Sequence, residues 1–416
     1  MSTNEPAMTN SNYYEGLNGK NIVLGLQHLI AMFGATVLVP ILTGLNPSVA
    51  LFSAGVGTLT FHAVTGGKVP VFLGSSFAFI ASIVAVGQTF GDLRYAQGGI
   101  MVAGLIYVLL SFLVKGIGVD KVRRLLPAQV VGPMIIVIGL NLVPVAYGMA
   151  SGSFLLAGIT LGSALLIKYV AKGFVQQLNI LLAVVIGYVV SLAMGQVDTS
   201  LISDAAFLAM PSFTTPLFDI GAIMMIAPIV LAVFMEHIGD ITTNGQVVGK
   251  NFIEDPGLNR TLLGDGLATL IAGLIGGPAN TTYGENTGVL AITKNYNPAT
   301  LRIAAGFAIV LAFVGKLGGT LSSIPVPVMG GISLMLFTMI AYIGVQTIKR
   351  EEVKANAKNL IVMALILFIG LSPTYLGLTI GIPVTSSVSI SGLSLAALVG
   401  VVANLALNGY KKQISE

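Results

Sequence analysis

The sequence predicts an all-α protein that crosses a membrane many times. Hydrophobic residues make up 55% of the 416 residues, charged residues only 9%, and the mean hydropathy is +0.92. A soluble domain does not have this balance, because its water-exposed surface needs far more charge. Apolar runs of about 20 residues recur along the chain, whereas the strands of a membrane barrel alternate over roughly ten residues. We therefore expect a bundle of transmembrane helices.

Fourteen segments are candidate membrane spans, and polar cytoplasmic tails are expected at 1–20 and 411–416. The first tail lacks the basic and apolar regions of a cleaved signal. The candidate spans lie at 22–43, 48–65, 69–86, 97–114, 128–148, 153–170, 178–195, 219–238, 262–277, 282–293, 300–317, 326–346, 358–372 and 389–408.

Basic residues test this number of spans, because Lys and Arg concentrate in the cytoplasmic loops of membrane proteins. With an inside N-terminus, only Arg94 and Lys316 fall outside, and the acidic 196–218 loop also fits the outer face. Adding or removing one mid-chain span would destroy this asymmetry. Both termini are therefore predicted to lie in the cytoplasm, beneath a plasma (bacterial inner) membrane. The inside set is Lys20, Lys68, Lys115, Lys121, Arg123, Arg124, Lys168, Lys172, Lys250, Arg260, Lys294, Arg302, Lys349, Arg350, Lys354, Lys358, Lys411 and Lys412.

Fourteen spans divide into two sets of seven, which predicts an inverted repeat because seven is odd. The third and tenth spans should then correspond, and both are interrupted. The third has Pro70 at its start and a Gly74-Ser75-Ser76 break, while Gly276-Gly277-Pro278 precedes the tenth. Paired interruptions at matching positions predict a substrate site near the midplane, with the N-termini of half-helices facing it.

The stretch from Thr281 to Gly288 is the most polar segment within the predicted membrane region. It reads Thr-Thr-Tyr-Gly-Glu-Asn-Thr-Gly and cannot form a lipid-facing helix turn. Such a segment must line a cavity enclosed by protein. Glu285 offers an acceptor or a proton, and Gly284 lets the backbone turn its N–H groups towards a ligand. We interpret this stretch as one half of a binding site.

Glu236 is the candidate for the other half, because five apolar residues precede it and acids inside membranes usually mark substrate or proton paths. Asp240 lies one turn further on the same helix face, where it is either a solvated cap or a second site residue. Two carboxyls this close in a desolvated cavity are expected to share one proton. His28 is either a structural histidine or a contact to the site or the proton path. His62 and Asp265 are given no role.

Several other chemistries have no signal in the sequence. Without cysteine the chain has neither disulfides nor thiolate ligands, and the acids and histidines are too sparse for a metal site. It also lacks a phosphate-binding P-loop and the Gly-x-Ser-x-Gly hydrolase motif. The basic residues that raise the pI to about 9.1 fall in short loops, which favours membrane orientation over nucleic acid. No cofactor, metal or nucleic-acid partner is expected.

Four segments carry a resemblance to a known family. Residues 285–294 fit a signature of an acidic or amide residue, Asn-x-Gly, then Thr and a basic residue, which is that of the nucleobase–ascorbate transporters. Residues 280–286, 27–40 and 73–80 are similar to the uracil permease branch of that family. The chain resembles this family over essentially residues 20–410.

The resemblance implies two inverted repeats of seven spans, arranged as two domains. A core (substrate-binding) domain would comprise 21–114 and 219–317, and a gate domain 115–218 and 318–410. Short antiparallel strands are expected in spans 3 and 10. The family also implies proton symport and frequent homodimers.

The resemblance further implies a site in which two carboxylates accept pyrimidine N–H groups and two backbone amides meet its carbonyls. Two more side chains would line the pocket. These residues are, in that order, Glu236 and Glu285, Phe77 and Gly284, and Tyr283 and Ser76. In one departure, Asp240 stands where the family places a histidine, so the proton-handling groups (Glu236, Asp240 and His28) need not match the family's.

The sequence thus predicts a proton-coupled uracil importer in the plasma membrane, not an enzyme, whose partners are uracil, H⁺ and membrane lipid. A xanthine or urate carrier of the same family is the alternative. An anion exchanger or channel on a related seven-plus-seven fold is less favoured, because a site with two glutamates and an aspartate does not present positive charge. A membrane enzyme is the least favoured interpretation.

Overall fold

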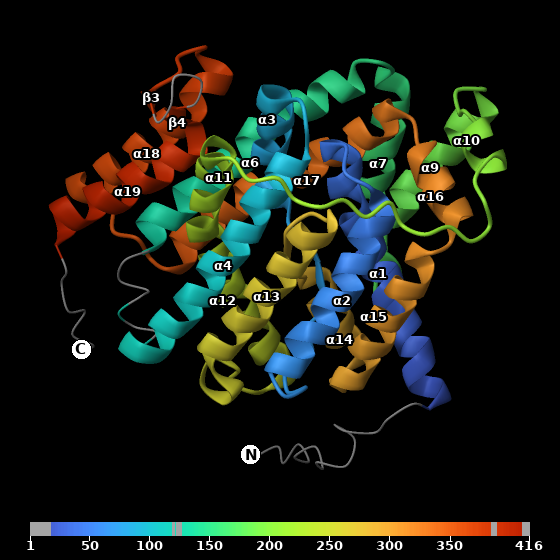
Figure 1. The fold of residues 1–416 in the computed structure, drawn as a ribbon, viewed down its shortest axis with the longest axis horizontal. Coiled ribbons are helices and arrows are strands. Elements are labelled where there is room, and N and C mark those ends of the chain that lie inside the picture. Colours follow the sequence, from blue (N-terminus) through green and yellow to red (C-terminus); the bar gives the residue numbers. More distant parts are fainter. Residues whose placement is uncertain (1–17, 119–120, 122–126, 384–388, 410–416) are drawn as a thin grey trace.

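The computed structural model describes residues 18–118, 121, 127–383 and 389–409, and these are mostly helical (Figure 1). Nearly all of the predicted N-terminal tail and the whole C-terminal tail lie outside the described residues. Four of the basic residues used to predict orientation also lie outside them: Arg123, Arg124, Lys411 and Lys412.

Among its described residues, the first half of the chain contains nine helices, one strand and one 3₁₀ turn. They are α1 (Gly19–Thr43), α2 (Pro47–Val64), β1 (Leu73–Ser75), η2 (Phe77–Phe79), α3 (Ile80–Phe90), α4 (Arg94–Ile117), α6 (Ala128–Ala150), α7 (Phe154–Val170), α8 (Phe174–Gln177), α9 (Asn179–Ala193) and α10 (Ser200–Ser203).

The second half contains the remaining elements. They are α11 (Ile220–Ile226), η3 (Ala227–Ile229), α12 (Val230–Val248), η4 (Ile253–Gly257), α13 (Leu258–Ile275), β2 (Asn280–Thr282), α14 (Gly284–Thr293), α15 (Pro298–Ala312), α16 (Gly315–Ser322), α17 (Val326–Arg350), α18 (Ala357–Tyr375), β3 (Gly381–Pro383), β4 (Ser389–Ser391) and α19 (Gly392–Asn408).

Local sequence sets where helices begin and end. The side chain of Asn46 accepts the backbone N–H groups of Ser48 and Val49, and Pro47 takes the first helical position of α2. Pro lacks an N–H but at this position none is needed, so cap and proline together favour a helix start. At the C-terminal end of α1, Gly44 adopts a left-handed φ of 80°, which stops the helix.

Each predicted span overlaps a helix of the structure. Among the described residues, seven helices are long and apolar enough to cross a membrane, and five further apolar helices are shorter, with 10–17 residues. The chain is therefore a multi-pass membrane protein. The number of fourteen crossings and the inverted repeat stay predictions.

Two spans differ from their predicted ends. The eighth was expected to end at 238, but α12 continues to Val248 because polar residues such as Asn244 and Gln246 extend a helix without adding hydropathy. The eleventh was expected at 300–317, but it divides into α15 and α16. At the break, the amide of Gly315, the first residue of α16, donates to the carbonyl of Phe207 in the segment after α10 at 3.0 Å.

The helices pack in two groups. In the first, α13 packs against α2 and α4, and α15 against α1 and α2; in the second, α17 packs against α6 and α7, and α18 against α6 and α19. Glycines allow both groups to pack closely. A Cβ at Gly104 of α4 would lie 2.6 Å from the amide nitrogen of Leu270, and one at Gly139 of α6 would lie 2.5 Å from the carbonyl of Phe337.

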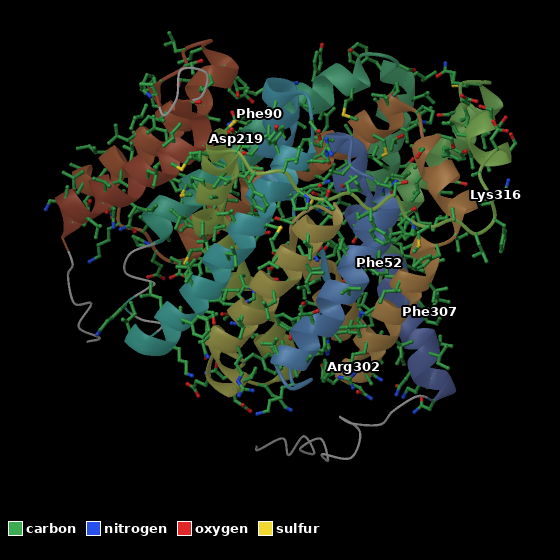
Figure 2. All side chains as sticks on the ribbon, in the orientation of Figure 1. Phe52, Phe90, Asp219, Arg302, Phe307 and Lys316 are labelled. Atoms are coloured by element: carbon green, nitrogen blue, oxygen red, sulfur yellow. The ribbon has the colours of Figure 1, made fainter. Side chains whose placement is uncertain are left out.

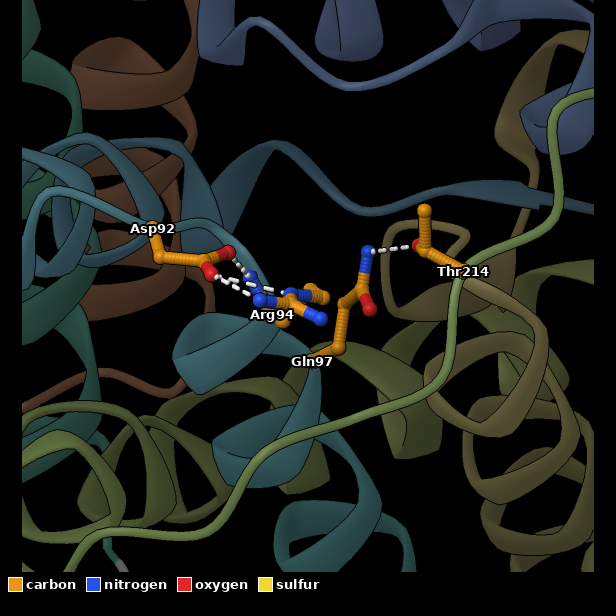
Figure 3. Close-up of polar contacts among 4 residues, drawn as sticks. All are labelled: Asp92, Arg94, Gln97 and Thr214. Carbon is orange, nitrogen blue, oxygen red and sulfur yellow. Dashed lines mark hydrogen bonds and ion pairs between the residues drawn. The ribbon is translucent and has the colours of Figure 1, made fainter.

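An extended segment at 204–219, called the strap below, joins α10 to α11 and crosses the front of the molecule in Figure 1. It is fastened to the first helix group. The amide of Thr214 donates to the carbonyl of Ile275 at 3.3 Å, and Gln97 of α4 donates to the Thr214 hydroxyl at 2.7 Å (Figure 3). The ring of Phe213, in the strap, packs against that of Phe52 in α2, with their centroids 5.1 Å apart.

The start of α4 is fixed on the same face. Leu217 of the strap donates to the carbonyl of Arg94 at 2.9 Å. The guanidinium of Arg94 forms an ion pair with Asp92 at 2.7 Å (Figure 3) and, through its hydrogen bond, lowers the pKa of that carboxyl. In Figure 2, Lys316 lies in the upper half of the view and Arg302 in the lower half.

Candidate functional site

The two interrupted segments meet in a short antiparallel strand pair. Strand β1 pairs with β2 in a register that runs from Leu73 opposite Thr282 to Ser75 opposite Asn280. This confirms the strands expected in spans 3 and 10. Each strand is followed directly by a helical segment, so two helix N-termini are held beside each other at the centre of the bundle.

Tyr283 braces this strand pair. Its amide donates to the carbonyl of Phe72 at 3.0 Å, and its hydroxyl donates to the carbonyl of Ser75 at 2.9 Å. The ring covers Gly74, where a Cβ would lie 2.5 Å from a ring carbon. Tyr283 is buried, so its main contribution in this structure is to hold β1 against the start of α14.

The helix starts at Phe77 and Gly284 present free backbone donors. The first N–H groups of a helix have no partner within it, and among the described residues neither of these two amides has an acceptor. Ser76, next to Phe77, is buried, and its hydroxyl oxygen has no hydrogen-bond partner among the described residues. These groups and the two helix dipoles can meet carbonyl oxygens of a ligand.

Gly284 is exposed, and a Cβ built on it would meet nothing within 4 Å. Its φ is not positive, so this glycine is not required for a left-handed turn. What its missing side chain provides is open space in front of the first turn of α14.

Glu236 is exposed, although its neighbours Phe234, His237 and Ile238 on α12 are buried. Glu285 is half-buried in the first turn of α14. The two acids and the two free amides lie on elements that adjoin the strand pair, since α12 contacts β2 and α14 follows β2 directly. This arrangement can accept two N–H groups and donate two.

Asp240 is fixed one turn after Glu236. It is half-buried, and the hydroxyl of Thr282 in β2 donates to its carboxylate at 2.9 Å. The alternative of a solvated helix cap is wrong, because α12 continues for two more turns to Val248. Asp240 instead ties α12 to the strand pair.

A cavity of about 240 Å³ lies between α12 and α14. One water needs only roughly 10–15 Å³ on this measure, so there is room for a small heterocycle. Asp240 and Gly284 stand at one end, and the cavity follows both helices towards their C-termini. The lining residues are Asp240, Thr243, Val247, Gly284, Thr287, Gly288 and Ala291.

The contacts of His28 are those of a structural histidine. It is 1% exposed, and the side-chain amide of Asn286 donates to its carbonyl at 3.0 Å and lies 3.2 Å from its Nδ1. This pair ties α1 to α14. His62 is also structural, with Nε2 2.9 Å from the carbonyl of Val71.

The sequence analysis missed a buried pair next to Glu236. His237 lies with Nδ1 3.2 Å from Asp265 and Nε2 3.0 Å from the hydroxyl of Thr261, and both ionisable side chains are fully buried. The residues are far apart in sequence and come from α12 and α13. The one signal was that Asp265 is an acid inside an apolar span, where an acid needs a partner.

We expect Asp265→Ala to destabilise the protein by about 1–3 kcal/mol, because it leaves a buried imidazole nitrogen without its polar neighbour. Circular dichroism of the purified protein should show a lower apparent Tm. Asp255→Ala is the matched control. Its exposed ion pair with Lys68, at 2.5 Å, should contribute at most about 1 kcal/mol. Equal melting of Asp265→Ala and wild type would show that the pair does not stabilise the fold.

A multi-pass helical protein with two broken segments meeting at its centre has the architecture of a secondary transporter. Residues 19–378 match the model of the Permease family (Xan_ur_permease), and the chain belongs to this family. It is therefore a membrane transporter and not an enzyme.

Curated relatives agree along nearly the whole chain. It is 41% identical over 405 residues to the "Probable uracil permease" of Haemophilus influenzae, covering 95% of this chain and 96% of that one. It is 42% identical over 407 residues to the "Uracil permease" of Bacillus caldolyticus, covering 94% and 93%. It is 40% identical over 394 residues to the "Uracil permease" of Escherichia coli strain K12, covering 92% and 90%.

Solved structures share the fold. SLC26A9 has a TM-score of 0.70 at 13% identity; the match covers 95% of this chain and 66% of that one. The transmembrane domain of BicA, described as a cyanobacterium bicarbonate transporter, has a TM-score of 0.62 at 17% identity, with 93% and 97% covered. At these identities the likeness concerns the fold alone.

Proposed function

We propose that this protein imports uracil across the plasma membrane by proton symport. Uracil presents two N–H donors and two carbonyl acceptors and carries no charge. The observation that carries the proposal is the matching set around the strand pair: the carboxylates of Glu236 and Glu285, and the free amides of Phe77 and Gly284. The three relatives named as uracil permeases, at 40–42% identity, support the same substrate.

The two helix groups support a division into a substrate-binding core (21–114 and 219–317) and a gate (115–218 and 318–410). In the proposed cycle one domain moves against the other around the fixed site. The cavity follows α12 and α14 towards Lys250 and Lys294, which the positive-inside rule places in the cytoplasm. With that orientation, the cavity extends from the strand pair towards the cytoplasmic side, on which the proposal also puts both termini.

Uptake of labelled uracil into proteoliposomes of the purified protein tests the function. We expect uptake driven by an inward pH gradient, competition by unlabelled uracil, and weak competition by xanthine, urate or sulfate. Stronger competition by xanthine or urate would assign a purine carrier. Transport of sulfate would assign an anion exchanger. Failure of excess unlabelled uracil to compete would end the proposal.

Asp240→Asn should abolish proton coupling but keep the site. Glu236 and Asp240 stand one turn apart on α12 and Asp240 lines the cavity; sharing one proton costs two carboxyls so placed less free energy than ionising both. We expect the variant to lose accumulation driven by a pH gradient while uracil exchange at equal pH stays near wild type. Asp204→Asn, on the exposed strap, is the control and should change neither activity. Full gradient-driven accumulation by Asp240→Asn would place the coupling proton elsewhere.

A further inference from the structure

The short helix α8, between α7 and α9, contacts α14 at one glycine of the cavity wall. A Cβ at Gly288 would lie 2.6 Å from the side-chain oxygen of Gln177 and 3.0 Å from its Cδ. Gly288 lies one turn after Gly284, on the face that lines the cavity. The carboxamide of Gln177 therefore occupies the space that any other side chain at position 288 would need.

The two sides of this contact are held by hydrogen bonds to different parts of the chain. On the side of α8, Gln176 donates to the carbonyl of Lys168 in α7 at 2.7 Å, and Asn179 at the start of α9 donates to the carbonyl of Gln176 at 2.7 Å. On the other side, Asn244 of α12 donates to the hydroxyl of Thr287 at 3.1 Å. Helices α7, α8 and α9 belong to the proposed gate, and α12 and α14 belong to the proposed core.

We propose that the contact between Gln177 and Gly288 is a closing contact of the transport cycle. It holds the gate against the core beside the cavity in this state, and it separates when the two domains move to the opposite-facing state. The flexible side chain of Gln177 can pack tightly against the backbone of Gly288, which has no side chain, and can also move away from it. The proposal rests on the transport function proposed above, and it assigns Gly288 to domain movement, not to ligand approach.

A rescue experiment separates these two roles of Gly288. We expect Gly288→Ala to slow uracil exchange roughly tenfold, as overpacking of a close contact does. Adding Gln177→Ala removes the side chain that the new methyl meets, so Gly288→Ala/Gln177→Ala should recover exchange. Gly306→Ala in α15, where a Cβ meets nothing within 4 Å, is the control. No recovery of exchange in the double variant would show that the methyl group acts through the ligand and not through Gln177, and would overturn the proposal.

A cross-link tests the same contact without relying on the substrate. The chain has no cysteine, so Gln177→Cys/Gly288→Cys introduces one pair into a clean background. Oxidant should protect both thiols from maleimide, arrest transport while uracil binding is retained, and release it again on reduction. Thiols that stay reactive under oxidant, or transport at the unlinked rate by the cross-linked protein, would overturn the proposal. A wild-type protein that carries no uracil would instead refute the proposed function and leave the cross-linking result valid.

Discussion

Glu236→Gln is expected to weaken uracil binding about 10- to 100-fold. The amide keeps the size and one acceptor but loses the charge, and a hydrogen bond to a charged group contributes about 1.5–3 kcal/mol. The loss should be large because Glu236 is exposed although its neighbours on α12 are buried, so its carboxylate has no other evident task in packing. Calorimetric titration of the purified variant with uracil measures the effect.

Glu254→Gln, an exposed acid in η4, is the matched control for Glu236→Gln and should bind as the wild type does. Glu285→Gln should show a loss similar to that of Glu236→Gln. Since both acids would contact one ligand, the double variant should lose less than the sum of the two single losses. Wild-type affinity in Glu236→Gln would remove that residue from the site.

Gly284→Val is expected to abolish uracil transport while the protein still folds. The space in front of Gly284 is open, so the valine fits the empty protein but projects where the ligand would approach the first amide of α14. Valine at an exposed helix start costs little stability compared with glycine. Gly306→Val, which also meets open space, should transport normally. Normal uptake by well-expressed Gly284→Val would contradict a role of the backbone amides in binding.

Much of this arrangement follows from the sequence because membranes impose simple rules. Charged or interrupted sequence at membrane depth has to line protein or a cavity. That rule singled out Glu236, Glu285 and the Gly74-Ser75-Ser76 break; in the structure the break pairs with β2, Glu285 lies in the first turn of the helix after β2, and the role of Glu236 stays a prediction. The predicted end of α12 was wrong because the last two turns of this helix are polar, and hydropathy does not detect polar helix turns.

Contacts between distant segments were beyond the sequence. The pairing of His237 with Asp265 depends on how α12 and α13 rotate about their axes, which hydropathy does not define. Asn286 was known as a polar residue of the site stretch, but its bond to His28 depends on the packing of α1 against α14. The role of Gly288 likewise depends on α8, a helix of four residues in a loop without any motif.

The central claim is that two carboxylates accept the two N–H groups of uracil. Calorimetric titration of the wild-type protein with uracil, 1-methyluracil and 3-methyluracil tests it most directly, because each methyl group removes one donor and leaves one carboxylate unpaired. We expect each methylated base to bind at least roughly tenfold more weakly than uracil. Binding of either methylated base as tightly as uracil would contradict the claim.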